Sequence, residues 1–237
     1  MSEAGQVLVS CRAITKVFDG KGAVAVQALR GIDLEVRAGE FLALVGPSGS
    51  GKTTLLNLVG ALDAPTAGQV VVLGKDLAKI TRGERARLRL DALGFVFQAY
   101  NLVPVLTAQE NVEFVLELQG VTAGERRARA KKVLEDLGLG ELMHRRPREL
   151  SGGQQQRVAV ARAVAARPKL VLADEPTANL DTENAHLLMD LMRKLRDDHG
   201  MTFVFSTHDA LVMEHAARIV RLRDGHIVED RPQVAAA

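Results

Sequence analysis

One stretch of the chain has the residue types and the spacing of a phosphate-binding loop. It consists of Gly46, Pro47, Ser48, Gly49, Ser50, Gly51, Lys52, Thr53 and Thr54. The glycines let backbone N–H groups turn toward phosphate oxygens without obstruction from side chains. Lys52 adds a positive charge for the terminal phosphates, and the Thr53 hydroxyl is suited to Mg²⁺. The spacing therefore predicts a site for a nucleoside triphosphate.

The segments on both sides of this loop are those that such a site requires. The apolar run 41–45 predicts a strand, and the run 55–61 predicts a helix whose N-terminal dipole points at the bound anion. The alternative is a plain glycine turn between a strand and a helix. It is the weaker interpretation, because the four fixed positions match by chance in about one chain of this length in a hundred.

A second apolar run, 170–173, is followed by two carboxylates, Asp174 and Glu175. So apolar a strand is expected inside a sheet, with the acids at its carboxyl end, where α/β proteins bind ligands. There Asp174 is suited to hold Mg²⁺ through water, and Glu175 to orient and deprotonate an attacking water. The alternative is that these acids cap the next helix, which Pro176 excludes only in part.

A third stretch combines a capped helix start with a pair of glycines: Leu150, Ser151, Gly152, Gly153 and Gln154. Ser151 and Gln154 have the spacing of a capping box, so a well-capped helix explains both of them. It does not explain the two glycines, because glycine lowers the stability of a helix. Glycines are expected at a helix start where the backbone must approach another group closely. An anion bound at the helix N-terminus would be such a group.

The order of these motifs resembles that of the ATP-binding cassette subunit of an ABC transporter. The shared motifs are GPSGSGKTT, LSGGQ, LVLADE, ANLD and the histidine of FVFSTHD, and the resemblance runs from about residue 7 to residue 230. It implies that Gln98 contacts Mg²⁺ and reports to a membrane partner, and that His208 contacts the γ-phosphate. Asp181 corresponds to the acid of the loop that links two copies. For stacking on adenine the candidate is Phe18, where tyrosine is usual; a core role for Phe18 is the alternative.

In that family two cassettes pair head to tail. The resemblance thus implies that residues 151–154 of one copy close over the ATP held by Lys52 and the phosphate loop of the other. The implied activity is Mg²⁺-dependent ATP hydrolysis with Lys52, Glu175 and His208 as catalytic residues. Phosphoryl transfer of this kind depends on positioning and charge stabilisation rather than covalent chemistry.

The hydrophobic pattern predicts an α/β fold. Short β-prone runs occur at 7–14, 31–36, 41–45 and 69–73, and strand and helix alternate again at 170–174, 183–198 and 203–207, before a hairpin about Asp224-Gly225. Between them lies a helical region with a short strand at 94–97 and capping-box spacings at Thr107/Glu110 and Thr122/Glu125. We expect a single nucleotide-binding domain, 1–237: a P-loop NTPase (RecA-like) core (1–95 and 167–230) with an antiparallel β subdomain, and an inserted helical subdomain (96–166).

Composition limits the class of protein. The chain has 237 residues, a net charge of +2 and one cysteine, Cys11. This charge gives no warrant for nucleic-acid binding, and one cysteine excludes an internal disulfide or a multi-cysteine metal site. Neither a secretory signal nor a run of about 20 apolar residues is present. Together with the family resemblance, which implies transmembrane permease subunits as partners, this leads us to expect a peripheral protein held at the cytoplasmic face of a membrane.

Within the family, three segments look most like the lipoprotein-releasing and macrolide-export type: 57–68, 95–114 and 173–181. Four residues are candidates for a groove that receives the partner's coupling helix, or equally for packing within the helical region: Tyr100, Leu102, Val103 and Leu106. One rival is a non-transporting cassette that regulates cell-wall hydrolysis through a division-type membrane protein. A second, an ABC ATPase of DNA repair or chromosome structure, lacks support because the chain has no heptad run and no cysteine pair.

Overall fold

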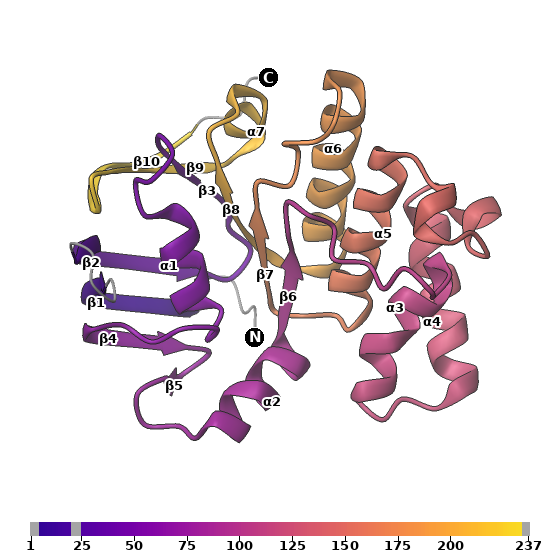
Figure 1. Cartoon of the computed structure of the whole chain (residues 1–237), viewed down its shortest axis with the longest axis horizontal. Coiled ribbons are helices and arrows are strands. Elements are labelled where there is room, and N and C mark those ends of the chain that lie inside the picture. Colours follow the sequence, from indigo (N-terminus) through magenta and orange to yellow (C-terminus); the bar gives the residue numbers. More distant parts are fainter. Residues whose placement is uncertain (1–4, 20–24, 234–237) are drawn as a thin grey trace. The chain divides into compact units, whose positions relative to one another are not determined.

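The computed structural model describes residues 5–19 and 25–233 (Figure 1). The chain forms two compact units, one made of Met1–Arg87 with Thr202–Ala237 and the other of Leu88–Met201. The first unit is therefore discontinuous in sequence, and the second is inserted into it. Helix α2 (Arg82–Ala92) spans the sequence boundary between them.

An antiparallel sheet forms one part of the first unit. Its strand order is β2-β1-β4-β5, with bounds β1 (Val7–Phe18), β2 (Val26–Arg37), β4 (Ala67–Val72) and β5 (Lys75–Asp76). Strands β1 and β2 are longer than the predicted runs. Their pairing contains a bulge, since the register shifts between Cys11 and Ile14, where Ala13 has a φ of 48°. Such a bulge breaks the alternation of inward and outward side chains that the sequence pattern relies on.

The other part of the first unit is built on strand β3 (Phe41–Val45). It lies between β8 (Thr202–Thr207) and β9 (Arg218–Arg223) and runs parallel to both, and β9 pairs antiparallel with β10 (His226–Pro232). Every residue of β3 is buried, as expected for a strand in a parallel sheet. The rings of Phe41, Phe203 and Phe205 pack together, with centroid separations of 4.5 to 5.9 Å.

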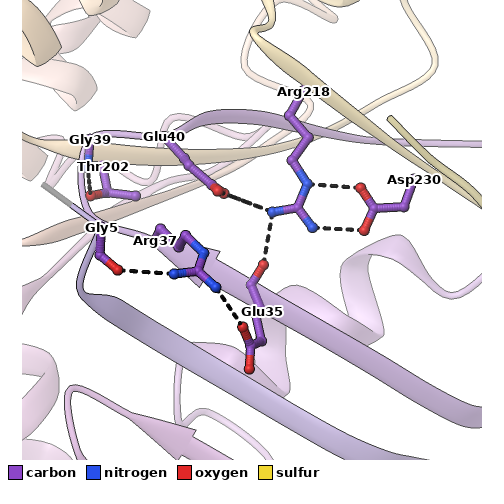
Figure 2. A network of polar contacts seen from close by, with 8 residues as sticks. All are labelled: Gly5, Glu35, Arg37, Gly39, Glu40, Thr202, Arg218 and Asp230. Atoms are coloured by element: carbon purple, nitrogen blue, oxygen red, sulfur yellow. Dashed lines mark hydrogen bonds and ion pairs between the residues drawn. The ribbon is translucent and has the colours of Figure 1, made fainter. Parts of the chain in front are cut away.

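A polar network fastens the strands of the first unit to one another (Figure 2). Arg218 on β9 donates to both carboxylate oxygens of Asp230 on β10, at 2.8 and 2.7 Å. It also donates to the backbone carbonyl of Glu35 on β2, at 2.9 Å, and to the carboxylate of Glu40, which directly precedes β3. One guanidinium therefore connects the antiparallel sheet with the strands around β3.

The second unit contains a pair of parallel strands and most of the helices. Its elements are β6 (Leu93–Val96), α3 (Ala108–Leu118), α4 (Ala123–Asp136), the 3₁₀ turns η1 (Gly140–Leu142) and η2 (Pro147–Glu149), α5 (Gly152–Ala165), β7 (Leu170–Asp174) and α6 (Thr182–His199). Strand β6 pairs with β7, and α5 packs against α3, α4 and β6. Gly94 permits the close approach of β6 to α5, since a Cβ atom there would lie 2.6 Å from the Ala163 carbonyl oxygen.

The local signals in the sequence are confirmed with one exception. Thr107 and Glu110 form the predicted capping box at the start of α3. Thr122 is the N-cap of α4, but its side chain makes no capping hydrogen bond among the described residues, so the second predicted box is wrong. The hairpin is present: Asp224 and Gly225 both have positive φ, at 49° and 79°, as a two-residue turn requires. In the part of the chain that the structure describes, no helix combines the length and apolar character needed to cross a membrane.

Candidate functional site

The phosphate loop connects β3 to helix α1 (Lys52–Val59), which packs against β8, β4 and β2 (Figure 1). Lys52 is only 6% exposed, and its ammonium group folds back over the loop. It donates hydrogen bonds to the carbonyl oxygens of Gly46, at 2.8 Å, and Pro47, at 3.1 Å. The predicted cation of the loop is thus held against the loop's own backbone.

The glycines of the loop have two different roles. Cβ atoms on Gly46 and Gly51 would lie 2.2 Å from the Leu222 carbonyl oxygen and 2.7 Å from the Ala28 carbonyl oxygen, respectively. These two glycines are needed because the loop packs tightly on its own unit. Gly49, with a φ of 79°, has no described atom within 4 Å of where its Cβ would be, which leaves its backbone open to a ligand.

The start of α1 has the features of an anion site. Its N-cap is Gly51, no described side chain caps it, and its first turn contains no acidic residue. Ser50 is 2% exposed, and its Oγ atom has no hydrogen-bond partner among the described residues. A helix N-terminus attracts anions, and a buried hydroxyl needs a partner. The loop as folded therefore fits the phosphates of a nucleotide.

The hairpin turn between β9 and β10 is hydrogen-bonded to the phosphate loop, a contact that the sequence did not reveal. The Gly225 N–H donates to the Ser50 carbonyl oxygen at 3.2 Å, and the Gly225 carbonyl oxygen accepts from the Arg30 N–H at 2.8 Å. The hairpin turn between β9 and β10 thus connects the phosphate loop to β2. The Asp224-Gly225 signal predicted the turn, but nothing in the sequence indicated that it would brace the loop.

His208 leaves the sheet at the same edge as the phosphate loop. Thr207 at the end of β8 is the partner of Val45 at the end of β3, and both strands run in the same direction. His208 is exposed, and the following Asp209 caps α7 (Ala210–His215) by accepting a hydrogen bond from the Leu211 N–H. The first unit therefore brings His208 and the loop to one edge of the sheet. Contact of His208 with the γ-phosphate stays a prediction.

Phe18 lies at the end of β1 and is 46% exposed. This exposure excludes the alternative that Phe18 belongs to the core. The ammonium group of Lys16 lies 4.9 Å from the centroid of the Phe18 ring, so one face of the ring already takes part in a cation–π contact. Stacking of Phe18 on adenine stays a prediction.

In the second unit, Asp174 and Glu175 lie at the carboxyl end of β7, as predicted. Both are half-buried, after four fully buried strand residues. Glu175 has a φ of 47°, in the left-handed region that non-glycine residues seldom occupy. The next helix, α6, begins at Thr182 and has Asp181 as its N-cap, so the alternative that Asp174 or Glu175 caps that helix is wrong.

Asp181 is therefore a capping residue, whatever else it does. Its carboxylate accepts hydrogen bonds from the backbone N–H of Asn184, at 2.9 Å, and from the Asn184 side chain, at 2.8 Å. These hydrogen bonds lower the pKa of Asp181, so the carboxylate is fully ionised at neutral pH.

The Ser151–Gln154 stretch forms the start of α5. The Ser151 Oγ atom accepts from the Gln154 N–H at 3.3 Å, and the Gln154 Oε1 atom accepts from the Ser151 N–H at 2.9 Å. The capping box therefore accounts for these two residues. A Cβ atom on Gly152 would lie 2.9 Å from the Tyr100 hydroxyl, and one on Gly153 would lie 3.0 Å from the Asn184 Oδ1 atom. The lack of a side chain at both glycines therefore leaves room for Tyr100 and Asn184 to pack against the helix start.

Gln98 follows β6 and is exposed, and its backbone carbonyl accepts from the Asn179 side chain at 2.9 Å. This bond connects the segment after β6 with the one before α6. In the described residues, no group of three or more His, Cys, Asp and Glu side chains forms a metal site by itself. The hydroxyl of Thr53, the amide of Gln98 and the carboxylate of Asp174 are oxygen donors of the kind Mg²⁺ takes. Their joint use stays a prediction.

The family model for ABC transporters matches residues 29–178. An uncharacterized ABC transporter ATP-binding protein of Thermotoga maritima is 50% identical over 214 residues, which cover 90% of this chain and 91% of that protein. The lipoprotein-releasing system ATP-binding protein LolD of Anaeromyxobacter dehalogenans is 50% identical over 212 residues, 89% of each protein. The macrolide export ATP-binding/permease protein MacB of Marinobacter nauticus is 49% identical over 227 residues, 94% of this chain but 34% of MacB, so the chain spans about a third of that relative.

Among solved structures, a dimeric post-hydrolysis state of the ATP-binding cassette MJ0796, bound to ADP and Pi, is 40% identical and superimposes with a TM-score of 0.88. The match covers 94% of this chain and 98% of that one. It confirms the predicted α/β fold with a P-loop NTPase core. The chain belongs to the ABC transporter family, as an ATP-binding and ATP-hydrolysing cassette.

Proposed function

We propose that the chain drives a transporter of the lipoprotein-releasing or macrolide-export type, by acting on separate transmembrane permease subunits at the cytoplasmic face of a membrane. The observation that carries the proposal is the 50% identity to LolD over 89% of each protein. The similarity to MacB points to the same group, although it covers only the cassette-sized third of that protein.

We assign the phosphates of ATP to the backbone of the Gly46–Thr54 loop, the α1 N-terminus and the Lys52 ammonium. Two observations support this assignment: α1 lacks a capping side chain among the described residues, and the Ser50 hydroxyl is buried without a described partner. Phe18 would stack on adenine. Thr53, Gln98 and Asp174 would hold Mg²⁺, which when bound neutralises charge on the phosphate oxygens.

Glu175 would orient the attacking water and accept its proton, and His208 would bind the γ-phosphate. The position of Glu175 directly after the buried strand β7 supports the first role, because a rigid strand fixes where the carboxylate starts. For His208, the support is its place beside the phosphate loop at one sheet edge.

The working form would be a head-to-tail dimer, in which Ser151, Gly152 and Gly153 of one copy close over the γ-phosphate bound by the other. The dimeric state of MJ0796 supports this arrangement. Asp181 would line the interface between the copies. Because the donors to the developing charge come from two subunits, a monomer should hydrolyse ATP poorly.

A groove of about 560 Å³ in the second unit is the candidate site for the permease. Its apolar part includes Leu106 and the 45% exposed Phe114, and its polar part includes Glu113 and Arg126, which lie 3.4 Å apart. Of the four residues predicted to meet a coupling helix, only Leu106 lines this groove. Tyr100, Leu102 and Val103 are half-buried in the segment that leads to it.

The Glu175→Gln variant tests the catalytic assignment. We expect it to bind ATP, to form a stable dimer in size-exclusion chromatography with light scattering, and to turn over about 100-fold or more slowly. The matched control is Glu183→Gln, in the first turn of α6, which should keep wild-type turnover. Full ATPase activity in Glu175→Gln would remove Glu175 from the role of base.

Reconstitution with the permease tests the transport assignment. In vesicles that hold the complex, a lipoprotein or macrolide substrate should stimulate ATP hydrolysis. A complex that hydrolyses ATP but gives no response to any such substrate would favour a regulator of cell-wall hydrolysis instead.

A further inference from the structure

Two consecutive residues after β6 hold an unusual backbone conformation. Tyr100 has a φ of 25° and Asn101 a φ of 51°. A side chain disfavours this left-handed region, and for a bulky residue such as tyrosine the conformation is a true outlier. Residues of this kind keep such a conformation only where surrounding groups hold them there.

Arg162, in the last turn of α5, supplies the contacts that hold these two residues. Its Nη2 atom donates to the Tyr100 carbonyl oxygen at 2.9 Å, and its Nη1 atom donates to the Asn101 carbonyl oxygen. One guanidinium therefore binds the carbonyls of both strained residues. The group is half-buried, and desolvation lowers the pKa of Arg162. A planar fork of N–H donors suits this task, whereas lysine offers a single point of attachment.

The turn also touches the first residue of the same helix. The Tyr100 hydroxyl lies where a side chain on Gly152 would be, 2.9 Å from the position of its Cβ atom. The Asn179 carbonyl oxygen lies 3.7 Å from that position, and the Asn179 side chain donates to the carbonyl of Gln98. The segment 98–101 is therefore connected to α5 near its C-terminus, through Arg162, and at its N-terminus, through Tyr100.

We propose that Arg162 is a positioning residue for the ATPase: by holding the Tyr100–Asn101 turn, it sets the Tyr100 hydroxyl against Gly152 and fixes the Ser151–Gly153 end of α5. The inference rests on the proposed function, in which Ser151–Gly153 acts on ATP in a second copy, and on the role that the family resemblance implies for Gln98, which is to report to the membrane partner. Arg162 would then join the sensing segment to the acting one. It would act through this turn and not by contact with ATP or the reacting water.

The chain offers a direct probe of this turn. Tyr100 is the only tyrosine, and there is no tryptophan, so ultraviolet fluorescence excited near the tyrosine band reports the turn alone. In Arg162→Lys we expect acrylamide to quench this fluorescence at least about twofold more efficiently, because the ring loses its fixed position. Far-UV circular dichroism should stay unchanged.

Kinetics separate a positioning role from a general loss of structure. For Arg162→Lys we expect kcat for ATP hydrolysis to fall about tenfold, with KM for ATP within about twofold of wild type, since the phosphate loop is unaltered. The matched control is Arg157→Lys on the same helix, whose guanidinium contacts the Leu137 carbonyl at 3.5 Å rather than the turn. It should leave both quenching and kcat near wild type.

A rescue variant makes the test decisive. Glycine adopts positive φ without a steric penalty, so Asn101→Gly in the Arg162→Lys background should restore part of the lost kcat and lower the quenching again. Unchanged quenching and kcat in Arg162→Lys would overturn the proposal, as would a loss that Asn101→Gly does not relieve. A wild-type chain without ATPase activity would instead refute the proposed function, and the quenching experiment would still test the role of Arg162 in the turn.

Discussion

The guanidinium of Arg218 and the carboxylate of Asp230 form two parallel hydrogen bonds, Nε to Oδ1 at 2.8 Å and Nη2 to Oδ2 at 2.7 Å. The same guanidinium donates to the Glu35 carbonyl and the Glu40 carboxylate. Its partners raise the pKa of Arg218, with the Asp230 hydrogen bond as the largest cause. Because the group serves strands that are distant in sequence, its loss affects several connections at once.

Arg218→Met should therefore lower the free energy of unfolding by about 2 kcal/mol, the value of a few charged hydrogen bonds reduced for partial exposure. Urea denaturation followed by far-UV circular dichroism measures the change. Arg223→Met is the control, because that side chain is 75% exposed and its carboxylate partner, Asp224, is 3.9 Å away. Equal stability of the two variants would show that the network contributes nothing measurable.

Gly46→Ala should lower ATP turnover about 100-fold for a steric reason. Its Cβ atom would lie 2.2 Å from the Leu222 carbonyl oxygen, so the loop must move, and a displacement of about 1 Å costs about 100-fold in turnover. Gly39→Ala is a matched control: its φ is also positive, at 80°, but no described atom lies within 4 Å of the new Cβ. That variant should lose about 1 kcal/mol of stability and keep its activity. ATPase assays on both variants check the contrast.

Substitution of Asn111 should lower the free energy of unfolding more than substitution of most other polar residues of the second unit. It is 1% exposed, and its Oδ1 atom accepts from the Val103 N–H at 2.7 Å. The two hydrogens of its Nδ2 atom face three carbonyl oxygens within 3.2 Å, of which that of Thr107, at 2.9 Å, is the nearest. Asn111→Leu should cost about 3 kcal/mol, because buried backbone groups lose their partners. Gln109→Ala, which removes a bond to Glu113 at the surface groove, should cost less than about 1 kcal/mol. Urea unfolding measures both changes. Equal losses in the free energy of unfolding would show that the hydrogen bonds of Asn111 do not stabilise the unit as expected.

Because the Cys11 thiol is buried, we expect the protein to lose stability at alkaline pH. Burial, with a smaller contribution from the charge of Asp33, raises the pKa of its thiol to about 12, whereas an unfolded thiol has a pKa of about 8.5. Above that value the unfolded chain releases a proton that the folded chain keeps. The stabilisation is therefore complete below about pH 8.5 and falls by about 1.4 kcal/mol per pH unit as the pH rises toward the folded value.

The measurement compares urea unfolding of the wild type and Cys11→Ala at pH 8 and pH 10. Titration of the other groups is common to both proteins, so the difference in slope belongs to Cys11. The thiol should also resist a disulfide reagent at pH 8 until the chain is unfolded. Rapid labelling of the native protein would contradict its burial.

Local chemistry made part of this structure predictable. The strand 41–45, the Thr107–Glu110 capping box and the Asp224-Gly225 turn each depend on neighbours within a few residues, so their signals lie in short stretches of sequence. The Thr122 box shows the limit, because the spacing permits a capping hydrogen bond but does not require it.

Contacts between distant residues were not predictable in this way. Nothing near Gly46 in sequence indicates that the Leu222 carbonyl lies against it, and nothing near Tyr100 points to Arg162. The sequence suggests that the glycines at 152 and 153 leave room for an anion, yet the side chains of Tyr100 and Asn184 in the same unit come close to them. Positions that motifs mark as functional thus carry packing constraints that only the fold reveals.

Strand β3 can pair with its two neighbours in the sheet only after both have been synthesised. Phe41–Val45 leaves the ribosome before the inserted unit, whereas β8 and β9, its partners on either side, follow the whole of that unit. A nascent chain that ends anywhere within that unit therefore carries an apolar strand with neither of its sheet partners. Such a strand is a target for chaperones and for aggregation. The pace of translation through residues 88–201 thus sets how long the centre of the nucleotide-binding sheet stays incomplete.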